Sequence, residues 1–359
     1  MKIKESIKPL RPYQPGKGIE EVKKEHQLHY IVKLASNENV YGPSPLVKEK
    51  VNDGPIDFEI YPDGYAEKLR LKLADSLHIN PDTLVFGSGS EEIIQMICRT
   101  YLEPGTNTVM ATPTFPQYKH YATVENAEVR EVPLLNGKHN LEKMRKQIDT
   151  QTRVVWLCTP NNPTGCYISK EELRTFLKQV SKDVLIVIDE AYYEFVFADD
   201  FPEAIPLIDA YENVLVLRTF SKAYGLAGLR VGYGVGSKDV ITNLNKIRGP
   251  FNVTSIGQMA AYFALEDQRY IDRIKAKNVE VRSSLEHFCN QHGLLFDKSE
   301  TNFLLIHLPT SGITVSEKLL TYGFIVRPGE LLGVPNSIRV TIGKKEDMDA
   351  FKVALLECI

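Results

Sequence analysis

The chain has 359 residues, 43% of them hydrophobic and 25% charged, an ordinary globular composition with enough apolar residues for a large core. Its net charge of −3 and its pI near 6.3 give no support to nucleic acid or an anionic membrane as a partner. No apolar stretch approaches the roughly 20 residues that span a bilayer, and the N-terminal residues lack the apolar core of a signal peptide.

The spacing of cysteines and histidines argues against disulfides and metal sites. The five cysteines, an odd number, are scattered without a Cys-x-x-Cys pair, as in proteins of reducing compartments. The eight histidines show no His-x-x-x-His or His-Glu-x-x-His spacing, so we expect no metal. Together these features predict a soluble cytoplasmic protein.

Strands alternating with helices begin at about residue 80, after an N-terminal part of different composition. Roughly the first 30 residues are rich in Pro, Lys and Glu and predict an arm followed by a short charged helix. Residues 83–86 predict a strand, followed by a Gly/Ser turn and a helix with apolar residues on one face. Short apolar runs recur at residues 108–111, 154–157, 184–188 and 214–217.

Such near-continuous apolar runs are typical of a mostly parallel sheet with helices on both faces. After Pro250 the sequence changes to long charged helices, over roughly residues 255–292, and then to short strands at 303–306, 324–326 and 338–342. We therefore predict an α/β protein. Its large domain spans residues 45–250, and a smaller α+β domain spans residues 251–359 and includes part of the N-terminal arm, residues 1–44.

Polar or aromatic residues follow several of these strands, at the edge where ligands bind in open α/β sheets. Gly89 and Ser90 precede a helix whose free N–H groups can hold a phosphate, although an ordinary helix cap has the same sequence. Tyr118 belongs to an aromatic segment that could stack on a flat ring or lie in the core. Asn162 stands between prolines, either pointing an amide into a cleft or forming a plain loop.

Asp189 directly follows an apolar run, and a carboxylate at the end of a buried strand is costly unless it meets a cation. A protonated pyridine nitrogen would be such a cation, with Tyr192 near the ring's phenolic oxygen; the alternative is a helix N-cap. Lys222 follows the next strand and can form a Schiff base with an aldehyde cofactor, although most lysines lie on the surface. Ser221 and Arg230 are the donors that a cofactor phosphate requires.

With these features in order along one chain, the sequence resembles the fold-type-I pyridoxal-phosphate aminotransferases over nearly its whole length. Within that family it is most similar to the histidinol-phosphate aminotransferases. The motifs that carry the resemblance are residues 10–17 with 20–22, then 34–39, 41–45, 61–64, 325–328 and 338–343. Val40 departs from the usual proline after Asn-Glu-Asn, and residues 329–333 replace a commonly glycine-rich turn, which leaves the substrate open.

The resemblance implies pyridoxal 5'-phosphate as the cofactor and assigns roles to most of these residues. Lys222 would bind the cofactor aldehyde and shuttle the substrate proton, and Asp189 would pair with the ring nitrogen. The remaining cofactor contacts that it implies are Asn162 and Tyr192 at the ring oxygen, Tyr118 stacked on the ring, and Ser221, Arg230, Gly89 and Ser90 at the phosphate.

The resemblance also implies a homodimer in which Tyr61 reaches the phosphate bound by the neighbouring subunit. Arg339 would bind the substrate α-carboxylate, whereas Tyr13 and Arg327 match positions linked to the distal end of the substrate, and Asn37 matches a further substrate contact.

The implied reaction converts L-histidinol phosphate and 2-oxoglutarate to imidazole acetol phosphate and L-glutamate in histidine biosynthesis. The alternatives are an aromatic amino-acid aminotransferase and a decarboxylase of the same fold, such as one acting on threonine phosphate. A cofactor-binding regulator without turnover is a further alternative, although no helix-turn-helix pattern precedes the fold.

Overall fold

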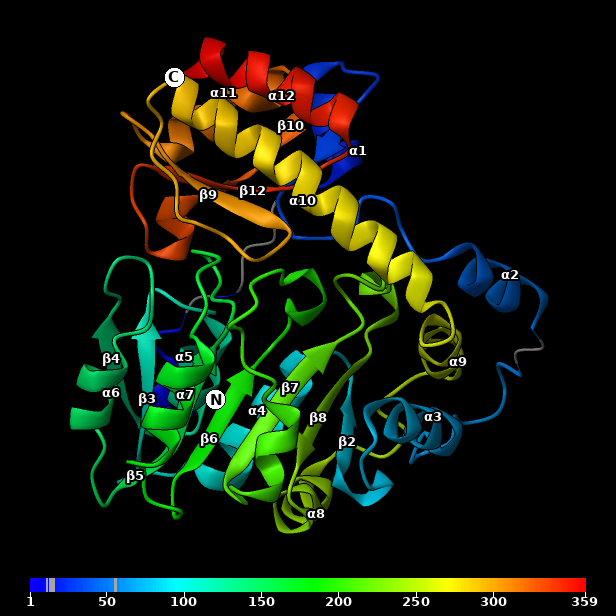
Figure 1. Cartoon of the computed structure of the whole chain (residues 1–359), viewed down its shortest axis with the longest axis vertical. Coiled ribbons are helices and arrows are strands. Elements are labelled where there is room, and N and C mark those ends of the chain that lie inside the picture. The colour runs from blue at the N-terminus through cyan, green and yellow to red at the C-terminus, as the bar shows by residue number, and fades with distance from the viewer. Residues whose placement is uncertain (11, 13–16, 55–56) are drawn as a thin grey trace.

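The computed structural model describes residues 1–10, 12, 17–54 and 57–359 and contains a large and a small part (Figure 1). The large part holds a seven-stranded sheet in the order β2-β8-β7-β6-β5-β3-β4, in which β8 alone runs antiparallel to its neighbours. The strands are β2 (Leu84–Gly87), β3 (Asn107–Thr112), β4 (Glu128–Pro133), β5 (Thr152–Cys158), β6 (Leu185–Asp189), β7 (Val214–Thr219) and β8 (Gly232–Gly236). The predicted mostly parallel α/β architecture is confirmed.

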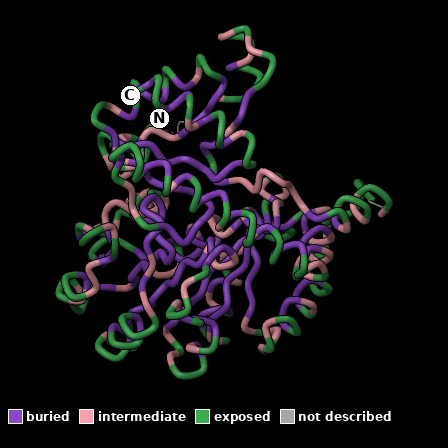
Figure 2. The backbone as a smooth tube through the Cα atoms, turned by 45° about the horizontal axis from the view of Figure 1, so that its top comes forward, coloured by how far each residue is buried: buried purple, intermediate pink, exposed green. Residues whose placement is uncertain are grey.

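Helices cover both faces of this sheet. One face packs against α4 (Ser90–Tyr101), α5 (Gln117–Val124) and α8 (Lys238–Ile247). The other packs against α3 (Glu67–Leu77), α6 (Leu141–Lys146), α7 (Lys170–Leu177) and α9 (Ser255–Ala264), and α2 (Pro45–Asp53) packs on α9. In β6, Ile186 and Ile188 enter one core while Leu185 and Val187 enter the other. Burial on both faces explains why the strand sequences are apolar throughout rather than alternating, and Figure 2 shows this buried interior.

The small part combines the C-terminal segment with part of the N-terminal one. Its antiparallel sheet has the order β11-β12-β9, and a separate parallel pair joins β1 to β10. The elements are β1 (Val32–Lys33), β9 (Phe303–His307), β10 (Phe324–Ile325), β11 (Arg327–Pro328), β12 (Ser337–Thr341), α1 (Ile19–His26), α10 (Gln268–Gln291), α11 (Gly312–Thr321) and α12 (Lys345–Cys358). Short 3-10 helices are η1 (Glu5–Ile7), η2 (Pro81–Thr83), η3 (Tyr193–Phe195), η4 (Ile205–Asp209), η5 (Ala227–Leu229) and η6 (Gly329–Leu332).

The long helix α10 joins the two parts, and the boundary predicted at residue 250 does not coincide with the change of core (Figure 1). Val253, the buried alanines of α9, and Ile271 and Ile274 in the first half of α10 pack in the core of the large sheet. Leu285 and Phe288, in the second half, pack in the core of the small part. A charged helix pattern runs through both halves, so the sequence gives no sign of the change.

The small part lies over the carboxyl ends of the parallel strands (Figure 1). This edge carries the residues that follow β2, β5, β6 and β7. The segment from β1 to α2 also crosses it. At its start, Leu34 is tied to the small part by main-chain hydrogen bonds with Ile325 and Thr341. None of the helices within the described ranges has both the length and the apolar character needed to cross a membrane.

Candidate active site

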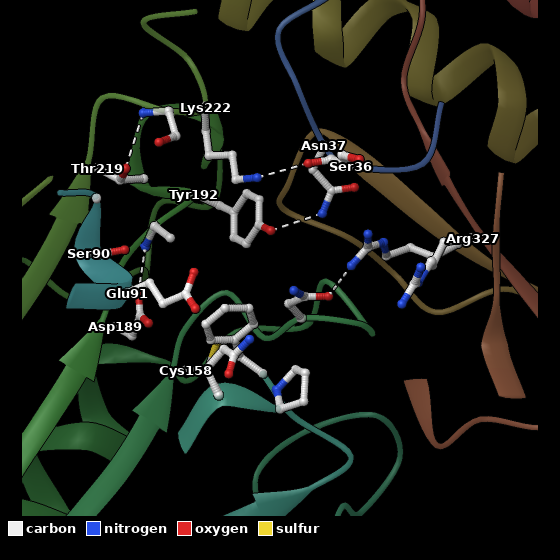
Figure 3. A pocket seen from close by; sticks show the side chains of 18 of the residues that line it. Ser36, Asn37, Ser90, Glu91, Cys158, Asp189, Tyr192, Thr219, Lys222 and Arg327 are labelled. Carbon is white, nitrogen blue, oxygen red and sulfur yellow. Dashed lines mark hydrogen bonds between the residues drawn. The ribbon is translucent and has the colours of Figure 1, made fainter. Parts of the chain in front are cut away.

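A cavity of about 410 Å³ opens between the strand ends of the large sheet and the small part (Figure 3). Most of the residues singled out in the sequence line it: Asn37, Gly89, Ser90, Asn162, Asp189, Tyr192, Ser221, Lys222, Arg230, Arg327 and Arg339. The sequence did not single out Ser36, Glu91, Phe115, Thr219 and Leu331, which line it as well.

Lys222 lies in the turn that follows β7, and its Nζ donates a hydrogen bond to the main-chain oxygen of Ser36 at 3.0 Å. Gly225 gives this turn its shape, since it has φ +71° and a Cβ there would overlap the main chain of Gly42. Burial, together with the positive charge of Arg339, lowers the pKa of Lys222 to about 7. A large fraction of this amine is therefore unprotonated near neutral pH, the form that attacks a carbonyl and accepts a proton.

Asp189 ends β6 and points into the cavity, 4% exposed. Its Oδ2 accepts a hydrogen bond from the hydroxyl of Tyr118 at 2.6 Å, and its Oδ1 accepts one from the N–H of Ala191 at 3.1 Å. Burial raises its pKa to about 6, although the Tyr118 hydrogen bond acts in the opposite direction. No basic residue in the described part of the chain forms an ion pair with Asp189. The carboxylate is thus placed to meet a cation supplied by a ligand.

Tyr118 does not fit the predicted role of stacking on a cofactor ring. Its side chain is fully buried, and its ring stacks on Trp156 with centroids 4.7 Å apart. Tyr118 belongs to α5, which begins at Gln117, and its side chain is buried beneath the cavity floor. Phe115 precedes the helix and lines the cavity. Phe115 is the aromatic residue of this segment that can cover a ring, and Tyr118 supports Asp189 instead.

The N-terminus of α4 and Arg230 form an anion-binding corner. Gly89 is the N-cap with φ +78°, and a Cβ there would overlap the Arg230 guanidinium, so glycine permits this close approach. No side chain caps α4 at Gly89, and Ser90 begins the helix. Arg230 donates to the hydroxyl of Ser221 and to the main-chain oxygen of Ser88, each at 3.3 Å. Helix N–H groups, a hydroxyl and a guanidinium together suit a phosphate.

The small part contributes two arginines to the opposite wall. Arg327 and Arg339 are register partners on β11 and β12, so both side chains emerge on one face. Arg339 is buried and donates to Asn162 Oδ1 at 2.5 Å and to the main-chain oxygen of Ala35 at 2.7 Å. Two positive charges at this wall favour anionic substrate groups.

Tyr192 and Asn37 meet above the floor of the cavity (Figure 3). The Asn37 side chain donates to the Tyr192 hydroxyl at 2.9 Å and accepts from the Thr341 hydroxyl at 3.1 Å. Burial raises the pKa of Tyr192 to about 12, so this phenol stays protonated at working pH. The amide of Asn37 is engaged by protein groups, and its contact with substrate remains a prediction.

Tyr61 does not line the cavity. Tyr61 is 79% exposed and stacks on Phe251, with ring centroids 4.7 Å apart. Tyr13 lies outside the described residues.

Residues 30–355 match the family described as aminotransferase class I and II. The chain belongs to this family. Histidinol-phosphate aminotransferase 2 of Oceanobacillus iheyensis is 54% identical over 356 residues, which cover 99% of this chain and 98% of that protein. The histidinol-phosphate aminotransferase of Bacillus subtilis strain 168 is 49% identical over 360 residues, covering both chains completely. The resemblance found in the sequence is therefore confirmed.

Solved structures agree on the fold. The histidinol-phosphate aminotransferase of Sinorhizobium meliloti, in complex with pyridoxal-5'-phosphate, has a TM-score of 0.90 at 28% identity, covering 99% of this chain and 97% of that one. An L-threonine-O-3-phosphate decarboxylase of Porphyromonas gingivalis has a TM-score of 0.80 at 22% identity, covering 91% of this chain and 99% of that one. The second likeness shows the fold alone, so it does not favour a decarboxylase.

Proposed function

We propose that this protein is a pyridoxal-phosphate-dependent histidinol-phosphate aminotransferase. It transfers the amino group of L-histidinol phosphate to 2-oxoglutarate, which gives imidazole acetol phosphate and L-glutamate. The observation that carries the proposal is the identity of 54% and 49%, over essentially the whole chain, with enzymes of that name.

The donors of the cavity fit the polar groups of pyridoxal phosphate. Arg230, Ser221 and the N–H groups that begin α4 suit the phosphate. Asp189 offers a buried carboxylate without an ion-pair partner among the described residues, which suits a protonated ring nitrogen. Lys222 lines the same cavity and supplies the amine for the aldehyde.

When bound, pyridoxal phosphate supplies an aldehyde for the substrate amine and a ring that takes up the electron pair left on the α-carbon. Lys222 then removes and returns the α-proton, for which a pKa of about 7 is suited. With the cofactor bound, Asp189 would hold the proton on the ring nitrogen, and Asn162 and Tyr192 would bond the ring oxygen. Arg339 binds the α-carboxylate of glutamate.

Both substrates use one pocket, and Arg327 lies beside Arg339 on the wall that the small part contributes. It binds the side-chain carboxylate of glutamate or the phosphate of histidinol phosphate. Arg327→Ala is therefore expected to raise KM about tenfold or more for both substrates, which corresponds to at least about 1.4 kcal/mol. Steady-state kinetics with each substrate measures this, and an unchanged KM for both would contradict the role.

The active unit is a homodimer. The segment with Tyr61 exposes several large apolar side chains: Phe58 (84%), Ile60 (62%) and Tyr65 (63%). In the dimer, the second subunit covers these apolar side chains, and Tyr61 of the first subunit reaches the cofactor phosphate bound by the second. Sedimentation equilibrium tests the dimer. Tyr61→Phe should weaken cofactor binding with the dimer mass unchanged, whereas unchanged affinity would leave Tyr61 without this role.

A half-reaction titration tests the function directly. The purified yellow protein is mixed with L-histidinol phosphate, L-phenylalanine or L-glutamate, and loss of the cofactor absorbance is followed. We expect histidinol phosphate to act at far lower concentration than phenylalanine. Equal response to phenylalanine would indicate an aromatic aminotransferase, and turnover without 2-oxoglutarate would indicate a decarboxylase. A protein that stays colourless with pyridoxal phosphate would refute the proposal.

A further inference from the structure

Behind Tyr192 lies a short chain of buried hydrogen bonds that begins at a main-chain N–H. The Asn37 N–H donates to Thr341 Oγ1 at 3.0 Å, Thr341 Oγ1 donates to Asn37 Oδ1 at 3.1 Å, and Asn37 Nδ2 donates to the Tyr192 hydroxyl at 2.9 Å. Asn37 and Thr341 are each 1% exposed and Tyr192 is 4% exposed. At this burial, water does not compete with these bonds.

The direction of this chain follows from its first member. A main-chain N–H can only donate, so the Thr341 oxygen must accept from it. The buried hydroxyl hydrogen of Thr341 needs an acceptor of its own, and Asn37 Oδ1 accepts it at 3.1 Å. With the amide turned over, Thr341 would accept twice, and no other acceptor for its hydrogen is found among the described residues. The side-chain oxygen of Asn37 therefore faces Thr341, and its NH₂ group faces Tyr192. The left-handed backbone of Asn37, φ +58°, is one that asparagine tolerates, and Asn302 holds it by donating to the Asn37 main-chain oxygen at 3.0 Å.

The consequence concerns the hydroxyl hydrogen of Tyr192. Its oxygen accepts from Asn37, so its own hydrogen is left for another acceptor, and Tyr192 lines the cavity. If the Asn37 amide were turned over, its oxygen would take that hydrogen and Tyr192 would have none to offer the cavity. The same logic applies to Asn162, whose oxygen accepts from Arg339 and whose NH₂ group is thereby directed away from the guanidinium.

We propose that Thr341 is a positioning residue that fixes the Asn37 amide and so makes Tyr192 a hydrogen-bond donor to the ring oxygen of the cofactor. This inference rests on the proposed function, since it requires pyridoxal phosphate in the cavity. Thr341 acts only through Asn37. It lies on β12 two residues from Arg339, so the strand that holds the substrate arginine also sets the donor for the cofactor.

The pH dependence of the cofactor's absorbance tests the role of Thr341. A donor to the ring oxygen stabilises the deprotonated chromophore and lowers the pH at which it titrates. Thr341→Val removes the hydroxyl at similar volume, and we expect the midpoint to rise by about one pH unit, a tenfold change in the proton dissociation constant. Thr341→Ser keeps the hydroxyl and should titrate within about 0.3 unit of the unsubstituted protein.

Thr152→Val is the matched control. Thr152 is also buried and donates its hydroxyl to Asn107 at 2.7 Å, but it begins β5, at the end opposite to the cavity. Its midpoint should not move. Equal midpoints for Thr341→Val and the unsubstituted protein would overturn the inference, and so would an equal shift in Thr341→Ser.

Asn37→Asp covers the case in which Thr341→Val does not fold. The new carboxylate can only accept, so it takes the Tyr192 hydrogen, and the midpoint should again rise; an unchanged or lower midpoint would overturn the inference. An unsubstituted protein without a chromophore would refute the proposed function itself. A normal chromophore with an insensitive midpoint would refute only the role of Thr341.

Discussion

Asp189 and Glu190 are neighbours at the end of β6 and both are buried, but they differ in whether a cation of the fold pairs with the carboxylate. Glu190 faces away from the cavity and is fully buried, and its Oε2 accepts from Arg218 Nη2 at 2.8 Å and from Arg218 Nε at 2.9 Å. Arg218 also lies 3.4 Å from the ring centroid of Tyr193. Burial acts to lower the pKa of Arg218, but the charge of Glu190 acts in the opposite direction, and the pKa is raised overall. Within the part of the chain that the structure describes, the hydrogen-bond partners of Asp189 are the Tyr118 hydroxyl and the main-chain N–H of Ala191.

This difference separates a structural charge from a functional one. Burial of an ion costs several kcal/mol unless a partner and hydrogen bonds offset it. Glu190 has its cation within the fold before any ligand arrives, although Arg218 bonds only its Oε2, and its Oε1 has no hydrogen-bond partner among the described residues. In the proposed function, Asp189 meets its cation when the cofactor binds, and that ion pair offsets the free-energy cost of burying the carboxylate.

Asp189→Asn should have the largest effect on activity. The amide keeps the shape but cannot hold a proton on the ring nitrogen, so we expect kcat/KM to fall by about 10³-fold, or about 4 kcal/mol of transition-state stabilisation. The apoprotein should unfold at an unchanged or higher temperature, because an unpaired buried charge is gone. Half-reaction kinetics and a thermal melt measure the two effects, and full activity in the variant would contradict the role of Asp189.

Glu190→Gln should show the opposite profile. It leaves the Arg218 guanidinium buried beside a neutral amide, and we expect a loss of about 3 kcal/mol in the free energy of unfolding. Urea unfolding of the apoprotein measures it, and the absorbance of the bound cofactor should titrate as before. The double variant Glu190→Gln with Arg218→Met removes both charges and should recover much of the loss. A stable single variant with a shifted chromophore would reverse the two assignments.

Cofactor affinity should also depend on pH through Asp189 and not through Glu190. The apoprotein carboxyl has a pKa of about 6, and binding favours its ionised form. As pH falls through about 6, protonation of Asp189 competes with binding, so the dissociation constant should rise about tenfold between pH 7 and pH 5. Equilibrium titration of the apoprotein measures this. The same slope in Asp189→Asn would assign the dependence to another group.

The sequence predicted the sheet and the position of most of these groups for one physical reason. Lys222, Asp189 and Asn162 each follow an apolar run too short for a helix and too apolar for a surface strand, so each had to lie at a strand end. The order of the runs then placed them at one edge of a parallel sheet. Side-chain chemistry at that edge suggested a cofactor without any tertiary information.

Other features had no signal that sequence reasoning could use. The main-chain oxygen of Ser36 accepts a hydrogen bond from Lys222, a role that does not depend on the side chain and so cannot be predicted from the residue type. Thr341 acts through a residue 304 positions away. Phe115 and Tyr118 are three residues apart in one aromatic segment, and only the start of α5 decides which ring faces the cavity. The first two depend on contacts between distant segments, and the third depends on a helix boundary that the sequence pattern does not fix.

Tyr118→Phe should have the smallest effect and refines the comparison. The variant keeps the ring on Trp156 and removes the hydroxyl that donates to Asp189 at 2.6 Å. That hydrogen bond lowers the pKa of Asp189, so its loss should move the midpoint of pH-dependent cofactor binding upward by less than one unit, or about 1 kcal/mol. Tyr121→Phe is the matched control, because it removes a hydroxyl that donates to Glu91 at 3.0 Å and leaves Asp189 untouched. A midpoint that moved equally in both variants would show that Tyr118 does not tune Asp189. A midpoint that moved only in Tyr118→Phe would show that the chain offsets part of the burial of Asp189 with one hydrogen bond and leaves the rest to the cofactor.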